Sequence, residues 1–159
     1  MVAIVAVAEN WGIGKDGDLL FSLRQDMRRF RTLTSYMTVI MGRKTLESLP
    51  GGKPLPNRVN VVISRGDVAT EGVIVCHSPE EAAEFTKQYP RVMVIGGGSI
   101  YRQMLPYCDT AYITKVHATP ASDTFFPNLD EDPQWMLSQV LLSGEEDGIG
   151  YEMCLYRRK

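Results

Sequence analysis

Short apolar runs recur along the chain and are separated by polar or glycine-rich turns. The runs lie at residues 2–8, 37–41, 59–64, 73–76 and 92–95. They are rich in Val and Ile, and each is too short to be an isolated helix. Runs of this length and composition predict strands that are buried on both faces of a sheet.

Segments with helical spacing separate several of these runs. Helices are predicted over about residues 23–34, 44–49 and 99–105. A further helix is predicted to open with Ser78 as N-cap and Pro79 at its first position. Further strands are expected near residues 110–117, 136–142 and 151–156. Residues 10–18 are polar and glycine-rich and predict a mobile loop. The pattern predicts one α/β domain over residues 1–159, with a mixed, mostly parallel sheet of about eight strands flanked by about four helices.

The first predicted helix carries a carboxylate on its apolar side. The inward stripe of this helix consists of residues at helical spacing: Leu23, Met27, Phe30 and Thr34. Asp26 falls on the same stripe, and an acid there is costly unless it is paired. Such a carboxylate could hold a protonatable ring or tune a proton transfer. Alternatively, Asp26 has no functional role and simply lies in the first helical turn, where acids are favoured and where Ser22 and Gln25 would form the cap.

Two junctions between a strand and a helix are candidate anion sites. In the first, Gly42 is followed by Arg43, Lys44 and Thr45, and in the second a strand ends in the run 96–98 of three glycines. Backbone N–H groups at a helix start, with cations beside them, suit phosphate groups. Neither junction matches a familiar nucleotide fingerprint, and each could be only a tight turn. Together they suit an extended dinucleotide, with Ser64-Arg65 as a third anion site or a solvated turn.

The composition limits which classes of binding partner and which cell compartment we expect for this protein. The formal net charge of −2 gives no field that would recruit nucleic acid or an anionic membrane. The three cysteines and two histidines lack the spacing of metal ligands, so no metal site is expected. The histidines lie far apart without a nearby carboxylate or thiolate pair, and both are interpreted as surface or sheet-edge residues. The apolar start is too short to span a membrane and has no basic flank. We therefore expect a cytoplasmic protein with reduced thiols.

The order and spacing of several motifs resemble the dihydrofolate reductases of the bacterial chromosomal type, over essentially the whole chain. These motifs are Ile13-Gly14, Asp26-x-x-x-Phe30-x-x-x-Thr34, Ile40-Met41-Gly42-Arg43-Lys44-Thr45-x-Glu47-Ser48, Pro54-Leu55-Pro56-x-Arg58-x-Asn60, Ile95-Gly96-Gly97-Gly98-x-x-Tyr101 and Asp123-Thr124-x-Phe126-Pro127. The resemblance implies NADPH-dependent reduction of 7,8-dihydrofolate to tetrahydrofolate, binding of antifolates and a monomeric state.

The resemblance also implies roles for individual residues. Asp26 would accept hydrogen bonds from the pterin and favour protonation of its N5, with water as the proton donor. Thr114 would share a water and the pterin 2-amino group with Asp26. Arg58 would grip the α-carboxylate of the glutamate tail, a bidentate task that suits arginine. Leu19 would lie near the nicotinamide, and Phe21 stands at a position that borders the pterin.

The remaining implied residues form the pocket wall and the cofactor site. The wall around the pterin and benzoyl rings would consist of Ile4, Ala6, Met27, Phe30, Leu49, Leu55, Ile95 and Tyr101. The NADPH site would consist of Ala6, Ile13, Gly14, Gly42, Arg43, Lys44, Thr45, Ser64, Arg65, Gly96, Gly97, Gly98, Ser99, Ile100 and Tyr101, with a cis bond between two of the glycines. Residues 10–23 would form a mobile lid.

The chain departs from the family pattern beside the implied catalytic helix. The family usually has Pro-Trp where this chain has Leu20-Phe21, and phenylalanine cannot donate the hydrogen bond of the indole. Two extra residues stand in the stretch 50–53, and Ser99 replaces a cation found in many relatives. We expect these changes to alter turnover, lid behaviour or antifolate response. A pyrimidine reductase on the same fold or a non-catalytic nucleotide-binding protein remain as alternatives, although Asp26 with Arg58 argues for a folate.

Overall fold

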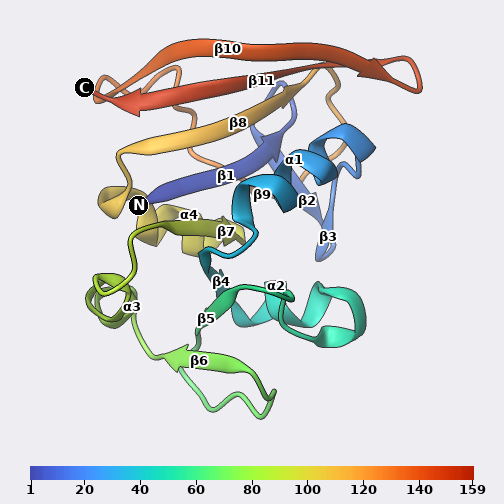
Figure 1. Ribbon diagram of the computed structural model, residues 1–159. Helices are drawn as coiled ribbons and strands as arrows, with labels where there is room; N and C mark the ends of the chain where they lie inside the picture. The colour runs from blue at the N-terminus through green and yellow to red at the C-terminus, as the bar shows by residue number, and fades with distance from the viewer.

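An eight-stranded sheet forms the centre of the computed structural model, which describes all residues from Met1 to Lys159. Its strands are β1 (Val2–Val7), β4 (Thr38–Gly42), β5 (Val59–Ile63), β6 (Val73–Cys76), β7 (Val92–Gly96), β8 (Thr110–Val116), β10 (Trp135–Glu146) and β11 (Ile149–Arg158). They lie in the order β10-β11-β8-β1-β7-β4-β5-β6 (Figure 1). The six strands from β8 to β6 in this order run parallel, and β11 and β10 add antiparallel partners at one edge.

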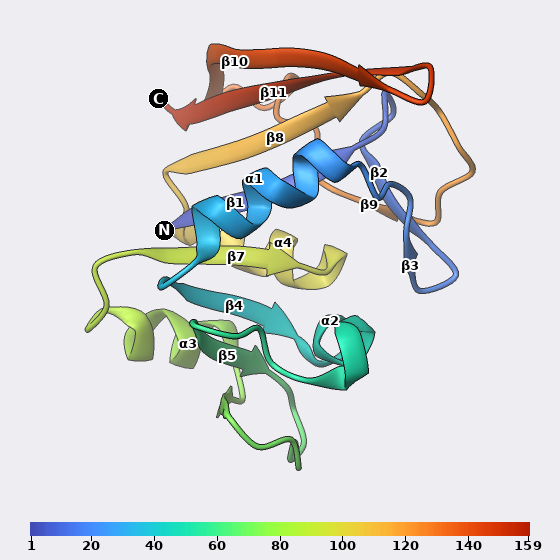
Figure 2. The ribbon, with the colours of Figure 1, turned by 45° about the vertical axis from the view of Figure 1, so that its right-hand side comes forward.

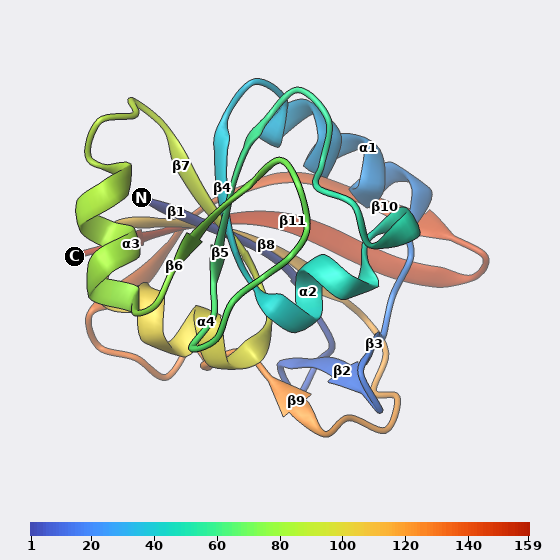
Figure 3. The ribbon, with the colours of Figure 1, turned by 90° about the horizontal axis from the view of Figure 1, so that it is seen from below.

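The helices cover both faces of this sheet, which explains why its central strands are apolar throughout. They are α1 (Arg24–Thr34), α2 (Arg43–Ser48), α3 (Pro79–Thr86) and α4 (Gly98–Met104), with short 3-10 turns η1 (Pro50–Gly52) and η2 (Leu105–Tyr107). Helices α1 and α2 lie on one face, and α3 and α4 lie on the other (Figures 2 and 3). The predicted α/β class, the mixed sheet and the number of helices are confirmed. Ser78 caps α3 as predicted, since its hydroxyl accepts from the N–H of Glu81 at 3.0 Å.

The apolar core is divided unequally between the two faces. Alternate residues of β4 belong to different clusters, with Ile40 in the large cluster of 23 buried residues and Val39 and Met41 in a cluster of four. The large cluster includes side chains of α4, whereas the small one takes only Leu46 from α2. The face that carries α1 and α2 therefore has the thinner core and leaves more of its apolar surface unfilled.

The prediction of a loop over residues 10–18 is wrong in part. Strands β2 (Gly12–Lys15) and β3 (Asp18–Leu19) form there, and together with β9 (Thr124–Phe125) they make a separate three-stranded sheet. Strands this short carry no readable periodicity, and one of the three lies more than a hundred residues away in the chain. The segment is therefore paired through its backbone to a distant part of the chain.

Two expectations for α1 are also wrong. Ser22 does not cap the helix, because the N-cap is Leu23 and no side chain of that residue can accept a hydrogen bond. Met27 is 45% exposed, although Leu23 and Thr34 are buried as the stripe predicts. Asp26, Arg29 and Leu33 of the helix line a small cavity against the sheet, and Met27 does not take part in it. The closing strands β10 and β11 are longer than predicted because the Asp147-Gly148 turn, a strong hairpin signal, joins them directly.

No helix is both long and apolar enough to cross a membrane. The cysteines Cys76, Cys108 and Cys154 are all buried and free, which agrees with their interpretation as small hydrophobic side chains. Burial raises the pKa of the Cys108 thiol to about 12, so this group stays protonated.

Candidate active site

Asp26 and Thr114 meet on the face of the sheet that carries α1. Asp26 lies in the first turn of α1, and Thr114 is a buried residue of β8 whose hydroxyl donates to Asp26 Oδ1 at 2.5 Å. The parallel register of β1 and β8 places Ala6 beside Thr114. Burial raises the pKa of the Asp26 carboxyl, while the Thr114 hydrogen bond and the charge of Arg29 act in the opposite direction. Asp26 is thus paired, but its pKa is still shifted upward.

A small cavity of about 20 Å³ lies behind Asp26, between α1 and the sheet. This volume is sufficient for one water molecule. Its polar lining comes from Asp26, Arg29 and Thr114, and the rest of its wall is Ile4, Leu33, Tyr112, Ile113, Leu141, Met153 and Cys154. Arg29 forms no ion pair in the structure, although it lies close enough to lower the pKa of Asp26. Nothing in the local pattern distinguishes Arg29, because it resembles the other arginines of α1, which are interpreted as solvent-facing.

A row of partly buried apolar side chains continues the site from α1 toward α2. Leu49, Leu55 and Ile95 all pack against the small cluster of β4, β5 and α2 and keep part of their surface open. Leu55 is held by a pair of hydrogen bonds, since its N–H donates to Asn60 Oδ1 and its carbonyl accepts from Asn60 Nδ2, both at 3.0 Å. Sequence reasoning gave Asn60 no role, although an asparagine inside a buried strand is a usable signal.

Arg58 stands at the outer end of this row with part of its guanidinium already fixed. Its Nε donates to Thr34 Oγ1 at 3.0 Å, and its Nη1 donates to the carbonyl of Pro56 at 2.9 Å. No carboxylate of the chain pairs with Arg58, and burial together with nearby Arg31 lowers the pKa of its guanidinium. A guanidinium held in this way presents its remaining N–H groups as a rigid fork for an external carboxylate.

The two glycine junctions lie side by side at the carboxyl ends of β4 and β7. A side chain at Gly97 would place its Cβ 3.6 Å from Thr45 Oγ1, and one at Gly42 would place its Cβ 2.9 Å from Cγ1 of Ile100. The peptide bond between Gly96 and Gly97 is cis. The structure therefore combines the two predicted anion sites into one surface formed by the starts of α2 and α4.

The third predicted anion site adjoins this surface. In the register of β4 and β5, Gly42 pairs with Ile63, so Ser64 and Arg65 follow next to the start of α2. Ser64 is buried and Arg65 is exposed, as are Lys44 and Ser99. Arg43, the first residue of α2, forms an exposed ion pair of 2.8 Å with Glu47. An exposed ion pair of this kind contributes little to the stability of the fold, so Arg43 can exchange it for a phosphate contact.

The predicted lid residues are brought against the second glycine junction, with one exception. Ile13 and Gly14 are buried in β2, and a Cβ at Gly98 would lie 3.9 Å from Cδ1 of Ile13. Asp123 accepts from the N–H of Asp16 at 2.9 Å, and this hydrogen bond is the largest cause of its lowered pKa. Leu19 is 79% exposed in β3 and contributes nothing to the site in this conformation.

Two aromatic residues of the implied site, Phe21 and Tyr101, are held by contacts with different parts of the sheet. Phe21 is half-buried and packs against the cluster formed by Leu23, Val116, Tyr151 and Met153. Tyr101 is buried, and its hydroxyl donates to the carbonyl of Ile4 at 2.7 Å. Burial raises the pKa of the Tyr101 hydroxyl, with a further contribution from the charge of Asp26. Tyr101 therefore stays a neutral phenol whose hydrogen bond holds β1 beside α4.

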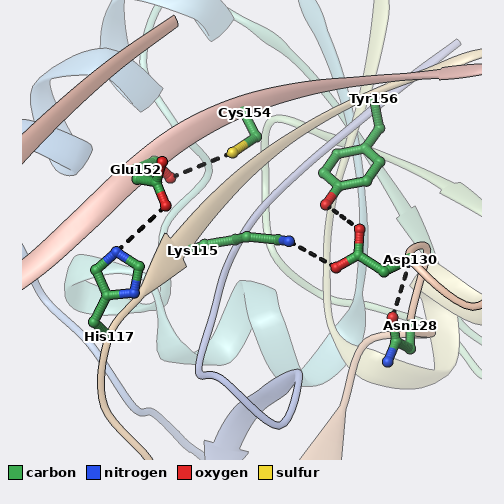
Figure 4. Close-up of polar contacts among 7 residues, drawn as sticks. All are labelled: Lys115, His117, Asn128, Asp130, Glu152, Cys154 and Tyr156. Atoms are coloured by element: carbon green, nitrogen blue, oxygen red, sulfur yellow. Dashed lines mark hydrogen bonds and ion pairs between the residues drawn. The ribbon is translucent and has the colours of Figure 1, made fainter. Parts of the chain in front are cut away.

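A second polar network lies on the opposite face of β8, because neighbouring residues of a strand point to opposite sides (Figure 4). Lys115 Nζ pairs with Asp130 at 2.7 Å, and the Tyr156 hydroxyl donates to the same carboxylate at 2.6 Å. His117 Nε2 lies 3.4 Å from a carboxylate oxygen of Glu152. The expectation that neither histidine has a carboxylate nearby is therefore wrong for His117, because the antiparallel pairing of β8 and β11 brings the two strands together.

Comparisons with known proteins agree with this geometry. The family model described as dihydrofolate reductase matches residues 1–158. A dihydrofolate reductase of Bacillus subtilis (strain 168) is 38% identical over 159 residues, covering 98% of this chain and 93% of the relative. A dihydrofolate reductase of Haemophilus influenzae is 44% identical over 127 residues, covering 80% of this chain and 78% of the relative.

A solved structure gives the same result for the fold. It is described as dihydrofolate reductase from Enterococcus faecalis complexed with NADP(H) and RAB-propyl, with a TM-score of 0.88 and 36% identity. The match covers 99% of this chain and 95% of that one. With the paired carboxylate, the joined glycine junctions and these matches together, the chain belongs to the dihydrofolate reductase family.

Proposed function

We propose that this chain catalyses the NADPH-dependent reduction of 7,8-dihydrofolate to tetrahydrofolate, by hydride transfer to C6 with protonation of N5. The observation that carries the proposal is the pairing of Asp26 with Thr114 on the thinly filled face of the sheet. Arg58 donates to Thr34 at the other end of α1, and the joined glycine junctions lie at the carboxyl ends of β4 and β7. A substrate with a ring at one end and a carboxylate at the other fits that arrangement.

Asp26 and Thr114 act on the pterin ring in this proposal. The ionised carboxylate of Asp26 accepts hydrogen bonds from the 2-amino group and N3–H of the ring. Thr114 donates to the carboxylate and so fixes its orientation. A negative charge held in a partly buried site favours a positive charge nearby, which is the condition for protonating N5 before the hydride arrives. Water delivers the proton, because the carboxylate binds the far side of the ring.

Arg58 and the apolar row bind the rest of the substrate. The wall residues Ile4, Ala6, Met27, Phe30, Leu49, Leu55, Ile95 and Tyr101 exclude water from the rings. Arg58 holds the α-carboxylate, and its orientation is supported by the hydrogen bonds to Thr34 and Pro56. Antifolates with the same ring chemistry would occupy the same wall, and Phe21 and the η1 turn are the places where their binding would differ from that in relatives.

The residues at the joined junctions fit a phosphorylated dinucleotide. When bound, NADPH supplies the hydride. The chain contributes backbone N–H groups at the starts of α2 and α4, the hydroxyl of Thr45 close to Gly97, and the cations Arg43, Lys44 and Arg65. Ser64 and Arg65 would read the 2′-phosphate that distinguishes NADP from NAD. A monomeric state and a cytoplasmic location remain our predictions.

The test is the dihydrofolate-dependent loss of NADPH absorbance with purified protein, run beside NADH and beside Asp26→Asn. We expect rapid loss with NADPH, little with NADH, and a loss of most turnover at neutral pH for Asp26→Asn with NADPH affinity retained. Partial recovery of the variant in acid is expected, because protonation of the substrate then no longer depends on the carboxylate. Absence of turnover from folded wild-type protein would overturn the proposal and direct attention to pyrimidine substrates.

A further inference from the structure

Helix α1 begins without any cap from its own sequence. The first N–H groups of a helix have no partner within the helix and need an acceptor from elsewhere. Leu23 occupies the N-cap position and cannot supply one, and Ser22 makes no such hydrogen bond. The helix that carries Asp26 therefore depends on another part of the chain for its start.

The acceptor is the carboxylate of Glu146, at the far end of β10. The backbone N–H of Arg24 donates to both oxygens of Glu146, at 3.0 Å and 3.1 Å. The side chain of Glu146 is only 14% exposed, whereas that of Arg24 is 74% exposed and its Nε lies 3.6 Å away. The backbone contact rather than the exposed ion pair defines the position of the carboxylate, because a solvated side-chain pair is weak and mobile. A negative charge at this end of a helix is also favoured by the helix dipole.

The hairpin that carries Glu146 is rigid at this point. Glu146 pairs with Ile149 across a two-residue turn in which Asp147 and Gly148 have φ of 52° and 79°. Two positive φ values are the signature of a tight hairpin turn whose twist matches its strands. Ile149 in turn packs against the cluster that contains Leu23, the N-cap residue of α1. The closed end of the β10–β11 hairpin thus lies against the start of α1 (Figure 3).

We propose that Glu146 is a positioning residue for the reaction: by capping α1 through the Arg24 N–H, it fixes the first helical turn and thereby the approach of the Asp26 carboxylate to Thr114. Asp26 is two residues beyond Arg24, in the same turn of the helix. This inference rests on the proposed function, because it assigns Glu146 to the geometry of that reaction. Glu146 contacts neither substrate nor cofactor in this account, and acts only through the helix.

Other groups around Asp26 do not supply this function. Arg29 on α1 and Tyr101 on α4 are the charged or titratable groups that influence the carboxyl, and Thr114 donates to it from β8. None of them contacts the free N–H groups at the start of α1. Loss of the cap would therefore let the first turn fray while these neighbours remain in place.

The experiment compares Glu146→Ala and Glu146→Gln with Glu145→Ala, an exposed neighbour on the same hairpin. The readouts are single-turnover hydride transfer over a range of pH, the KM for dihydrofolate and the Kd for NADPH. We expect Glu146→Ala to lower the rate of hydride transfer about fivefold to tenfold, within the range that loss of a helix cap allows. NADPH affinity should stay unchanged, and Glu146→Gln, which still offers an acceptor oxygen, should restore most of the rate.

Several outcomes would overturn the proposal. Glu146→Ala with wild-type rate and pH profile would do so, and a lowered Tm without any kinetic change would show a purely structural cap. Equal losses of the hydride-transfer rate in Glu146→Ala and Glu146→Gln would also count against it. They would show that the negative charge of Glu146 matters, and not its hydrogen bond to the Arg24 N–H. Hydrogen exchange of the Arg24 amide and a carboxyl NMR titration of Asp26 need no turnover, so they test the positioning role even if the proposed activity is absent. Slower exchange in wild type than in Glu146→Ala, with a displaced Asp26 titration, supports it.

Discussion

Replacing Thr114 by valine isolates the contribution of one hydrogen bond to the candidate catalytic carboxyl. Valine has nearly the shape of threonine and suits a β-strand, so the packing of buried Thr114 against its neighbours in β8 should survive. What disappears is the hydroxyl that donates to Asp26 at 2.5 Å. Asp26 then remains half-buried without a donor from the chain.

The direction and size of the change in the pKa of Asp26 follow from the contacts of this carboxyl. Burial raises the pKa of Asp26 and the Thr114 hydrogen bond lowers it, so removing the donor should raise that pKa further. A hydrogen bond to a charged group contributes about 1.5–3 kcal/mol, and about 1.36 kcal/mol corresponds to one pH unit. The midpoint of the acidic limb in the pH profile should therefore move upward by about one to two pH units.

The higher pKa should lower the stability of the variant at neutral pH. The pKa of Asp26 in the folded protein lies above its unfolded value, so the favourable contribution is complete below the unfolded pKa and is lost as pH rises through the folded pKa. Thr114→Val enlarges that loss, and the variant should be less stable than wild type at neutral pH but nearly equal to it in acid. Denaturant unfolding at several pH values measures this difference.

Thr110→Val is the matched control for these measurements. It lies on the same strand, and its hydroxyl contacts only the exposed carboxylate of Asp109, at 3.0 Å. The pH profile of this control should match wild type. An unchanged or lowered midpoint in Thr114→Val, by kinetics and by carboxyl NMR of the apo protein, would refute the assigned electrostatic role.

Two further predictions concern substrate binding and stability. Arg58→Leu should weaken dihydrofolate binding by at least about tenfold with NADPH affinity nearly unchanged, because it removes a charge-assisted bidentate contact. The control is Arg91→Leu, because Arg91 and Arg58 both line one surface groove; this variant should leave both affinities unchanged in binding titrations. Equal losses of affinity for both ligands in Arg58→Leu would mark that residue as structural. Asp26→Asn should raise the free energy of unfolding at neutral pH, because it removes a carboxylate whose ionisation burial disfavours. A less stable variant at pH 7 in denaturant titrations would contradict the raised pKa of Asp26.

Most of the fold was readable from local pattern. The buried runs became the parallel strands, Ser78-Pro79 opened α3, and the glycine junctions ended β4 and β7 as predicted. These features depend on residues close together in the chain, whose burial and dihedral preferences are set locally. The Asp147-Gly148 turn is an equally local signal, and it makes the closing strands β10 and β11 longer than predicted by joining them directly.

The sequence by itself determined the strands of the main sheet, the helices, the family motifs and the presence of an acid on the inner side of α1. Only the tertiary structure decided what that acid meets. Thr114 is 88 residues from Asp26, and Glu146 is 122 residues from the Arg24 amide that it caps. Which distant groups come into contact depends on strand order and register, and a misplacement by one residue turns every side chain of a strand to the other face. Local periodicity identifies the buried side of each element, whereas the packing of the elements chooses the partners that complete the site.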